Sequence, residues 1–448
     1  MQDQRARVDA GRDEAGRDDA GRDEGRATTG GPSGRNARVL VAFTAVTNLT
    51  DGITKIALPL VAGSLTKSPA LVSGVLFAMT LPWLLISLPV GVLVDRADRR
   101  RLLWLANGLR VVAVGALLAV AESGGLGLPL LYACAAALGI AEVVALTSAA
   151  ALVPDAVAPA GRERVNVLMT GVETVANEFA GPFLGGLLVA VGASLALGVS
   201  AGGYLTATVF LLFLAGRFRA ARTAGAADPS ADPSADRPPA SVTGQIGEGL
   251  RFLWRQRLLR SLSLSVAVLV TCWAAWFALM PLVATGVWRL SPTAYGALVG
   301  ALGVGGLAGT LVVGRINRLL GRRRAMSANV FAAASLVAVP ALTANVWATG
   351  VAAFLGGLGS TLWVVNARTI GQTLVPPDMM GRYSSVSRLF SWGSLSLGAA
   401  AAGALAQAVG YRWAFAFFAA AAAIVAVPFV RAFTPEALAE VETRLSAH

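Results

Sequence analysis

Twelve long apolar segments, separated by short polar gaps, dominate residues 38 to 431 of this chain. A helix needs about 20 apolar residues to cross a bilayer, and only helices and closed barrels satisfy their backbone hydrogen bonds there. With 14% charged residues, the chain also departs from the roughly 25% that is typical of soluble domains. The pattern therefore predicts an all-α membrane protein with twelve transmembrane helices.

The apolar segments form two groups of six. Those of the first group lie near residues 38–61, 71–93, 102–121, 128–151, 166–190 and 194–216. Those of the second group lie near residues 261–285, 293–313, 325–343, 346–366, 385–408 and 412–431. The long polar stretch between the groups contains two Ala-Asp-Pro-Ser repeats, a composition typical of linkers.

Two sequence echoes indicate that the groups are copies of one unit. Residues 312–318 repeat the pattern of residues 93–99 without its two acids, and Leu-Val-Pro at 374–376 repeats Leu-Val-Pro at 152–154. Both echoes have about the same offset. We therefore expect two pseudo-symmetric six-helix bundles, which is the repeat architecture of secondary transporters.

The domain organisation follows from these boundaries. We expect a disordered cytoplasmic tail, an N-terminal six-helix half, a cytoplasmic linker with an amphipathic helix, a C-terminal six-helix half and a second cytoplasmic tail, at residues 1–37, 38–216, 217–260, 261–432 and 433–448. The first tail consists of glycine-spaced charged repeats that bury too little apolar surface to fold. The amphipathic stretch at 246–255 either lies on the inner membrane surface or acts as a regulatory site.

Arginines cluster in every second gap, for example at 96–101 and 315–324, whereas the other gaps carry only Lys67, Arg289 and Arg412. Cytoplasmic loops of membrane proteins are enriched in basic residues, so both termini are expected to be cytoplasmic. The expected location is the bacterial inner membrane. Basic residues distributed in this way do not form the single soluble face that nucleic acid binding requires.

Several kinds of chemistry are excluded by residue counts. The only histidine is the last residue, His448, and the two cysteines, Cys134 and Cys272, lie inside apolar segments. A histidine triad, a zinc site and a histidine proton relay are therefore excluded, and we expect neither a metal nor a cofactor. Proton chemistry would have to use carboxylates.

Asp51 lies about halfway along the first apolar segment, and an ionisable residue at that depth is costly unless it is paired or faces water. Lys55 follows four positions later on the same helix face. Either the two residues form an intrahelical ion pair without a further role, or Asp51 exchanges a proton for a cationic substrate. Glu142, at a similar depth in the fourth segment, is the second candidate for a proton-carrying carboxyl.

Three more charged residues lie inside the apolar segments. Arg110 in the third segment is a counter-charge for either acid, as a static partner or as a substrate contact. Glu173 and Glu178 in the fifth segment are five residues apart and so not quite on one helix face. Either glutamate could be part of a proton path. The alternative for Glu173 is that its side chain only reaches the inner membrane interface.

The gap between the second and third segments carries a recognisable motif. It reads Gly-Val-Leu-Val-Asp-Arg-Ala-Asp-Arg-Arg-Arg at residues 91–101. This resembles the Gly-x-Leu-x-Asp-Arg-x-Gly-Arg-Arg loop of the major facilitator superfamily, with Asp98 where the motif has glycine. Together with Leu-Pro-Trp at 81–83, the loop is similar to the branch that contains macrolide efflux pumps and siderophore exporters.

The resemblance implies a cytoplasmic gate in this loop. Its expected residues are Gly91, Asp95, Arg96, Asp98, Arg99 and Arg100. Asp95 would accept hydrogen bonds from the start of the eleventh helix and pair with arginines near Arg382 or Arg388. Asp98 would share this role or offset the arginines around it.

The fifth segment contains a second motif, formed by Gly181, Pro182, Gly185 and Gly186. It is similar to a motif shared by proton-driven exporters of the same superfamily, of the drug:proton antiporter type. Gly-Pro pairs also occur in membrane helices merely as kinks.

The superfamily lines its central cavity with helices one, four, seven and ten, which favours a cavity-facing Asp51. It also implies a set of aromatic residues in or near the cavity, namely Trp273, Trp276, Phe277, Trp363 and Trp392. Such rings hold large apolar or cationic substrates by stacking and cation–π contact, or else they pack against lipid and neighbouring helices.

These observations predict a proton-coupled exporter of a small amphiphilic organic molecule, such as an antibiotic, drug or siderophore, that works by alternating access. We expect a monomer whose partners are the substrate, protons and the lipid bilayer. Uptake of a solute by the same fold is the alternative. A polytopic membrane enzyme is less favoured, because the sequence lacks an internal histidine and clustered acids outside the loop at 91–101.

Overall fold

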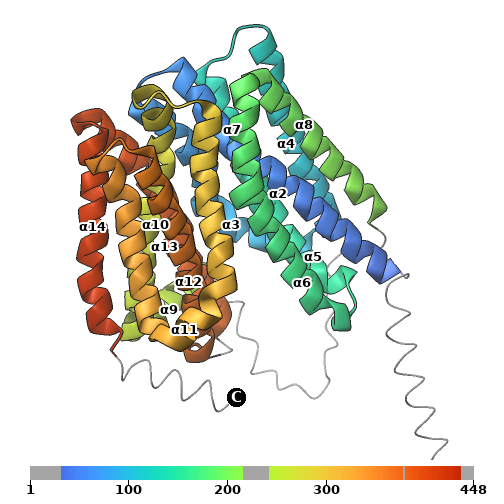
Figure 1. Ribbon diagram of the computed structural model, residues 1–448. Helices are drawn as coiled ribbons and strands as arrows, with labels where there is room; N and C mark the ends of the chain where they lie inside the picture. Colours follow the sequence, from blue (N-terminus) through green and yellow to red (C-terminus); the bar gives the residue numbers. More distant parts are fainter. Residues whose placement is uncertain (1–31, 215–241, 377–378, 435–448) are drawn as a thin grey trace, which may run out of the picture.

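The computed structural model describes residues 32–214, 242–376 and 379–434, and every regular element in these ranges is a helix. The helices form two side-by-side groups, drawn from blue to green and from yellow to red (Figure 1). We call them the N-terminal half, residues 32–213, and the C-terminal half, residues 257–432. The predicted all-α membrane fold with two bundles is confirmed.

The N-terminal half contains seven α-helices and two short irregular helices. They are α2 (Pro32–Leu65), α3 (Pro69–Arg96), α4 (Arg99–Glu122), α5 (Leu128–Ala156), α6 (Pro159–Glu173), the π-helix η1 (Thr174–Ala180), α7 (Gly181–Val191), α8 (Ala193–Phe210) and the 3₁₀-helix η2 (Leu211–Phe213). The elements α6, η1 and α7 follow one another without a break and together form the fifth predicted segment.

The linker helix α9 (Val242–Arg255) precedes the C-terminal half. That half consists of α10 (Arg257–Leu282), the π-helix η4 (Val283–Val287), α11 (Pro292–Leu342), α12 (Val346–Leu374), α13 (Met380–Val409) and α14 (Tyr411–Ala432). Ten helices of the described chain are long and apolar enough to cross a membrane. Helix α2, which is not among these ten, covers the first predicted segment, and α11 covers two. All twelve predicted segments therefore coincide with described helices, within a few residues at their ends.

Two boundaries differ from the sequence pattern. Residues 32–37, inside the stretch assigned to the tail, belong to α2, and a proline such as Pro32 is tolerated in the first turn of a helix. The element α11 consists of two helices that meet inside the polar gap at Gly321, whose φ of 76° and ψ of 157° are not helical. Glycine adopts positive φ without strain, so Gly321 is the point at which the helix of the eighth segment ends and that of the ninth begins.

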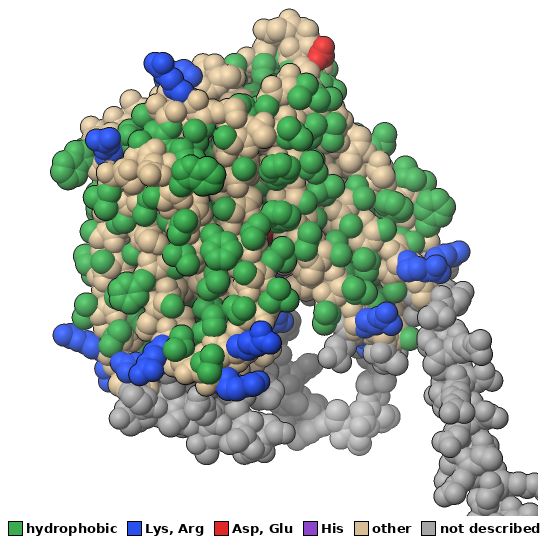
Figure 2. Space-filling model, viewed as in Figure 1, with side chains coloured by type: hydrophobic (Ala, Val, Ile, Leu, Met, Phe, Trp, Pro, Cys, Tyr) green, Lys and Arg blue, Asp and Glu red, His purple; other side chains and the backbone are tan. Residues whose placement is uncertain are grey.

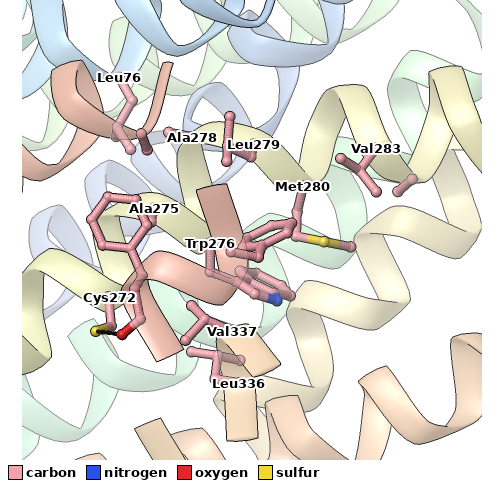
Figure 3. Packing of buried hydrophobic residues seen from close by; sticks show 14 of the residues in the cluster. Leu76, Cys272, Ala275, Trp276, Ala278, Leu279, Met280, Val283, Leu336 and Val337 are labelled. Atoms are coloured by element: carbon pink, nitrogen blue, oxygen red, sulfur yellow. Dashed lines mark hydrogen bonds between the residues drawn. The ribbon is translucent and has the colours of Figure 1, made fainter. Parts of the chain in front are cut away.

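The two halves meet along α3 with α13 and α10, and along η1 and α7 with α11. Ile56 of α2 and Leu76 of α3 belong to the same buried cluster as Trp276 of α10. Figure 3 shows Leu76 close to Ala278 at this contact. A continuous apolar core therefore joins the halves.

The start of α2, the helix α9 and the end of α14 lie at the same end of the molecule, which we call the linker face (Figure 1). Figure 2 shows most of the visible Lys and Arg side chains along this end. Basic residues of this kind anchor the ends of membrane helices at the interface with water.

Candidate functional site

A buried charged cluster lies where α2, α4 and α8 meet. Arg110 of α4, whose side chain is only 1% exposed, donates from Nη2 to Oδ2 of Asp51 at 3.0 Å. Tyr204 of α8 donates its hydroxyl hydrogen to the other carboxylate oxygen of Asp51 at 2.7 Å. Both oxygens of Asp51 are therefore partnered within the N-terminal half.

Neighbouring polar groups hold this cluster in place. The Thr54 hydroxyl, one helical turn beyond Asp51, lies 3.2 Å from the Tyr204 hydroxyl, and Asn107 accepts from Nη1 of Arg110 at 3.2 Å. The guanidinium of Arg110 also lies 5.3 Å from the centre of the Tyr204 ring, within cation–π distance. Three helices are thereby tied together at one point. Tyr204 was not singled out from the sequence, although a tyrosine inside an apolar helix needs a partner for its hydroxyl.

Lys55 does not pair with Asp51, although it lies four residues further along α2. Its Nζ is 3.0 and 3.3 Å from the two carboxylate oxygens of Glu178 on η1. It also lies 5.1 Å from the centre of the Phe277 ring on α10. The intrahelical ion pair is not formed, because each charge has an oppositely charged partner on a neighbouring helix. Since Phe277 belongs to the C-terminal half, the Lys55–Glu178 pair lies where the halves meet.

Glu142 and Glu173 form no ion pair with any other described residue. Glu142 of α5 lies within electrostatic reach of Asp51 and Arg110 and beside the indole of Trp83. Glu173 of α6 lines, together with Asp51, a cavity of about 170 Å³ between α2, α5 and α6, which we call the acidic cavity. Two carboxyls near the charged cluster are thus without an ion-pair partner among the described side chains.

The backbone between Glu173 and Glu178 changes their relation. The segment η1 is a π-helix, in which hydrogen bonds join residues five apart, so residues with this spacing lie closer to one face than in an α-helix. The charges of Glu173 and Glu178 accordingly interact. π-Helical turns occur frequently at functional sites. This one ends directly at Gly181 and Pro182, and the proline has no N–H to donate.

The glycines of the second motif bring backbones into direct contact. A Cβ on Gly181 would lie 2.7 Å from the Gly52 Cα of α2, and one on Gly185 would lie 2.8 Å from the Ile53 oxygen. A Cβ on Gly186 would lie 2.5 Å from the Pro292 oxygen, across the boundary between the halves. Only glycine fits these approaches, so the motif packs α7 against α2 on one side and against α11 on the other.

The C-terminal half contains a cavity of about 810 Å³ between α10, α12 and α13. Trp273, Trp363 and Trp392 line it, and we call it the aromatic cavity. Trp276 was expected to line this cavity but does not, because its side chain is 0% exposed and packs into the core cluster that joins the halves. Phe277 is also absent from the lining and instead contacts Lys55.

The aromatic cavity extends to the linker face. Its lining includes Gln372, near the end of α12, and Tyr383, near the start of α13. The polar groups in its wall therefore lie mostly at this end, and the tryptophans lie deeper.

One aromatic stack joins the two halves. The rings of Trp83 on α3 and Trp392 on α13 are 4.0 Å apart between centroids and inclined by 8°. Trp392 lines the aromatic cavity, and Trp83 lies beside Glu142. The stack therefore connects a carboxyl of the N-terminal half with the cavity of the C-terminal half. In the sequence, Trp83 was noted only as part of the Leu-Pro-Trp stretch at 81–83, which resembles the branch of macrolide efflux pumps and siderophore exporters.

Most of the motif at 91–101 is helical, and only Ala97 and Asp98 connect α3 to α4. Asp98 is the N-cap of α4 and accepts from the backbone N–H groups of Arg100 and Arg101. Arg99 bonds to the Ala151 carbonyl and the Asp155 carboxylate at the end of α5.

The other residues of the expected gate are placed less completely. Gly91 is half-buried, and Arg100 reaches the Leu212 carbonyl at 3.5 Å. The side chains of Asp95 and Arg96 lie outside the described part of the structure. Asp98 thus serves as a local helix cap, which accounts for an acid at a position where the family loop has glycine.

One of the two arginines expected to pair with Asp95 forms an ion pair with the linker helix α9 instead. Arg382 pairs with Glu248 of α9 at 3.0 Å. Leu253 of α9 is completely buried against the cluster that contains Tyr383. Arg388, the other expected partner of Asp95, lines the aromatic cavity. The apolar face of α9 therefore docks on the start of α13. The two alternatives from the sequence, a helix on the membrane surface or a regulatory site, stay predictions.

Comparison with known proteins relates this arrangement to transporters. The multidrug efflux pump Tap of Mycolicibacterium fortuitum is 27% identical over 85% of this chain and 92% of its own length. The multidrug efflux pump Tap of Mycobacterium tuberculosis is 33% identical over 62% of this chain and 67% of its own length.

Solved structures share the fold at low sequence identity. A bacterial homologue of the iron transporter ferroportin, in an inward-facing state, matches with a TM-score of 0.67 and 17% identity over 89% of this chain and 98% of its own. The nucleoside transporter NupG matches with a TM-score of 0.63 and 11% identity over 88% of this chain and 99% of its own.

The sequence pattern of one family covers almost the whole chain. It is described as transmembrane secretion effector and matches residues 33–447. The two-bundle fold, the loop at 91–101 and the relatives agree with this match. The protein therefore belongs to the transmembrane secretion effector family of the major facilitator superfamily, and it is a multi-pass membrane transporter, not an enzyme.

Proposed function

We propose that this transporter is a proton-coupled exporter of a small amphiphilic organic molecule. The observation that carries the proposal is the unpaired Glu142 beside the buried Asp51–Arg110 ion pair and the cross-half tryptophan stack. Ionisable residues at membrane depth mark ion pathways and proton relays in transporters. The relatives that are named multidrug efflux pumps support export of organic molecules.

The proposed coupling uses the two unpaired carboxyls, Glu142 and Glu173. The Asp51–Arg110–Tyr204 network keeps one negative and one positive charge in the N-terminal half. A cationic substrate group and a proton compete for the same unpaired carboxylate, because each neutralises it. Protonation on one side of the membrane then releases the substrate, and loss of the proton on the other side prepares the next binding event.

The proposed movement separates the halves where they now touch. The glycine contacts of α7 with α11 lie at the end away from the linker face, whereas the aromatic cavity extends to the linker face. This matches a transporter open at the linker face, as the inward-facing ferroportin homologue is named. The basic linker face supports cytoplasmic termini in the bacterial inner membrane. Alternating access requires the Lys55–Glu178 pair, which contacts Phe277, to rearrange as the halves rock.

The test uses inverted membrane vesicles with an acidified lumen and a panel of positive, negative and zwitterionic fluorescent amphiphiles. We expect the protein to accumulate at least one dye in the lumen and a protonophore to abolish the accumulation. Glu142→Gln should lose dependence on the proton gradient while still exchanging dye across the membrane. Glu122→Gln, an exposed acid at the end of α4, is the matched control and should behave as the wild type.

Two results would contradict the proposal. If Glu142→Gln accumulated dye at the wild-type rate when driven by the proton gradient, Glu142 would not be part of the proton path. Protein-dependent uptake of the same dyes into intact cells would show import instead of export.

A further inference from the structure

The two cavities carry opposite charge. The described lining of the aromatic cavity contains two basic side chains, Arg368 and Arg388, and no Asp or Glu. The described lining of the acidic cavity contains Asp51 and Glu173 and no Lys or Arg. The chain therefore presents positive charge from the C-terminal half and negative charge from the N-terminal half.

Three charged side chains at the two walls form no ion pair within the described part of the chain. Arg368 and Arg388 are exposed at the end of the cavity near the linker face, and neither forms an ion pair with a described residue. In the acidic cavity, Arg110 already pairs with Asp51, whereas Glu173 forms no ion pair with a residue that the structure describes. One wall thus offers guanidinium groups and the other a carboxylate.

The wall between these groups is apolar and aromatic. Trp273, Trp363 and Trp392 line the deeper part of the aromatic cavity. The Trp83–Trp392 stack belongs to a cluster that also contacts Leu146, which lines the acidic cavity. Packed apolar side chains therefore lie between the two cavities, across the boundary between the halves.

We propose that the transported molecule is amphoteric, with an anionic group for Arg368 and Arg388, a planar apolar body for the tryptophans and an amine for Glu173. This inference rests on the proposed function and specifies its substrate class. Guanidinium groups bind carboxylates through two parallel hydrogen bonds, and a cavity lined by one sign of charge concentrates ions of the opposite sign. A molecule with only positive charge finds no counter-charge in the described lining of the aromatic cavity and meets two cations there.

The test compares two dyes that differ in one charge. Rhodamine 110 carries a free carboxylate beside a cationic xanthene ring, and rhodamine 123 is its methyl ester and lacks the anion. Binding is measured by fluorescence anisotropy on the full chain in phosphatidylcholine nanodiscs. We expect rhodamine 110 to bind about tenfold more tightly, which corresponds to about 1.4 kcal/mol.

The variants assign this preference to the arginines. Arg368→Gln and Arg388→Gln should each reduce the preference about threefold, and the double variant should bind both dyes equally. Arg255→Gln removes an exposed arginine of α9 outside the cavity and should retain the full preference. Both cavity arginines are exposed, so their replacement by glutamine leaves the folded core intact, which size-exclusion chromatography checks.

The inference is overturned by equal binding of both dyes to the wild type, by tighter binding of the ester, by absence of saturable binding, or by an unchanged preference in the double variant. Its failure differs from failure of the proposed function. Acid preference without gradient-driven dye accumulation would refute the exporter and leave the charge assignment standing. Gradient-driven dye accumulation without a preference for rhodamine 110 would refute the charge assignment and leave the exporter standing.

Discussion

Arg110→Gln should leave the Asp51 carboxylate buried without its counter-charge. Asp51 would then keep only the hydrogen bond from Tyr204. Asp51→Asn makes the reciprocal change and leaves the guanidinium of Arg110 unpaired at 1% exposure. The double variant replaces both charges by neutral amides of similar shape. The three variants together form a double-mutant cycle for one ion pair.

The magnitude follows from the geometry. At the 3.0 Å that separates Arg110 Nη2 from Asp51 Oδ2, two unit charges attract by roughly 5 kcal/mol in an effective dielectric of about 20. Removing one partner of a buried pair costs about 3 to 5 kcal/mol, because the remaining charge is left uncompensated. Replacing both partners avoids that cost, so the double variant should lose only about 1 to 2 kcal/mol.

The measurement is the melting temperature of the purified protein in detergent, followed by tryptophan fluorescence. For a unit of 150 to 250 residues, which includes the size of the N-terminal half, 1 kcal/mol corresponds to about 2 to 4 °C. Arg110→Gln should therefore lower the melting temperature by about 6 to 20 °C, and the double variant by much less. Asp51→Asn and the double variant should insert into the membrane and lose gradient-driven transport.

The control is Glu122→Gln, which removes an exposed charge from the end of α4 and should change the melting temperature by less than about 2 °C. Additive losses in the double variant would mean that the two side chains do not stabilise each other. Full gradient-driven transport by Asp51→Asn would show that the ion pair has only a structural role.

Three further changes test other contacts. A Cβ on Gly186 would lie 2.5 Å from the Pro292 oxygen, so the side chain of Gly186→Val should force α7 and α11 apart. The variant should be destabilised by about 1 to 3 kcal/mol in the melting assay and transport less dye. Trp83→Ala should cost about 3 to 5 kcal/mol and weaken dye binding through loss of the stack on Trp392, whereas Trp83→Phe should retain most of both. Asp98→Ala should cost about 1 kcal/mol and Asp98→Asn almost nothing, because asparagine is an equally good N-cap; loss of transport in Asp98→Asn would instead indicate a gate.

The positions of the helices were predictable because the length of an apolar segment is a local property. The partners of the charges were not. Local rules pair Asp51 with Lys55 at a spacing of four residues. In the fold, Arg110 approaches Asp51 from 59 residues away and Glu178 approaches Lys55 from 123 residues away. Tertiary proximity therefore decided between two pairings that the sequence left open.

The rotation of a helix about its axis was also hidden from the sequence. Trp273 and Trp276 lie one turn apart on α10, and both were expected to line the cavity. Only Trp273 does so, because the packing of α10 against α11 and α13 turns Trp276 into the core. Similarly, the π-helical turn at η1 depends on a missing N–H at Pro182 and on backbone contacts with α2, which no hydrophobic period reveals.

The two copies of the loop motif differ mechanically. In the first copy, Ala97 is the C-cap of α3 and Asp98 is the N-cap of α4, so two separate helices meet at these residues. In the second copy, the equivalent residue is Asn317, whose amide exchanges hydrogen bonds with Asn366 of α12 at 3.0 Å while the helix continues. The backbone contact of Gly303 with Glu178 and the arginines at 315 and 318 therefore belong to one helix, which ends at Gly321, so a displacement of η1 at Gly303 would move these arginines with it.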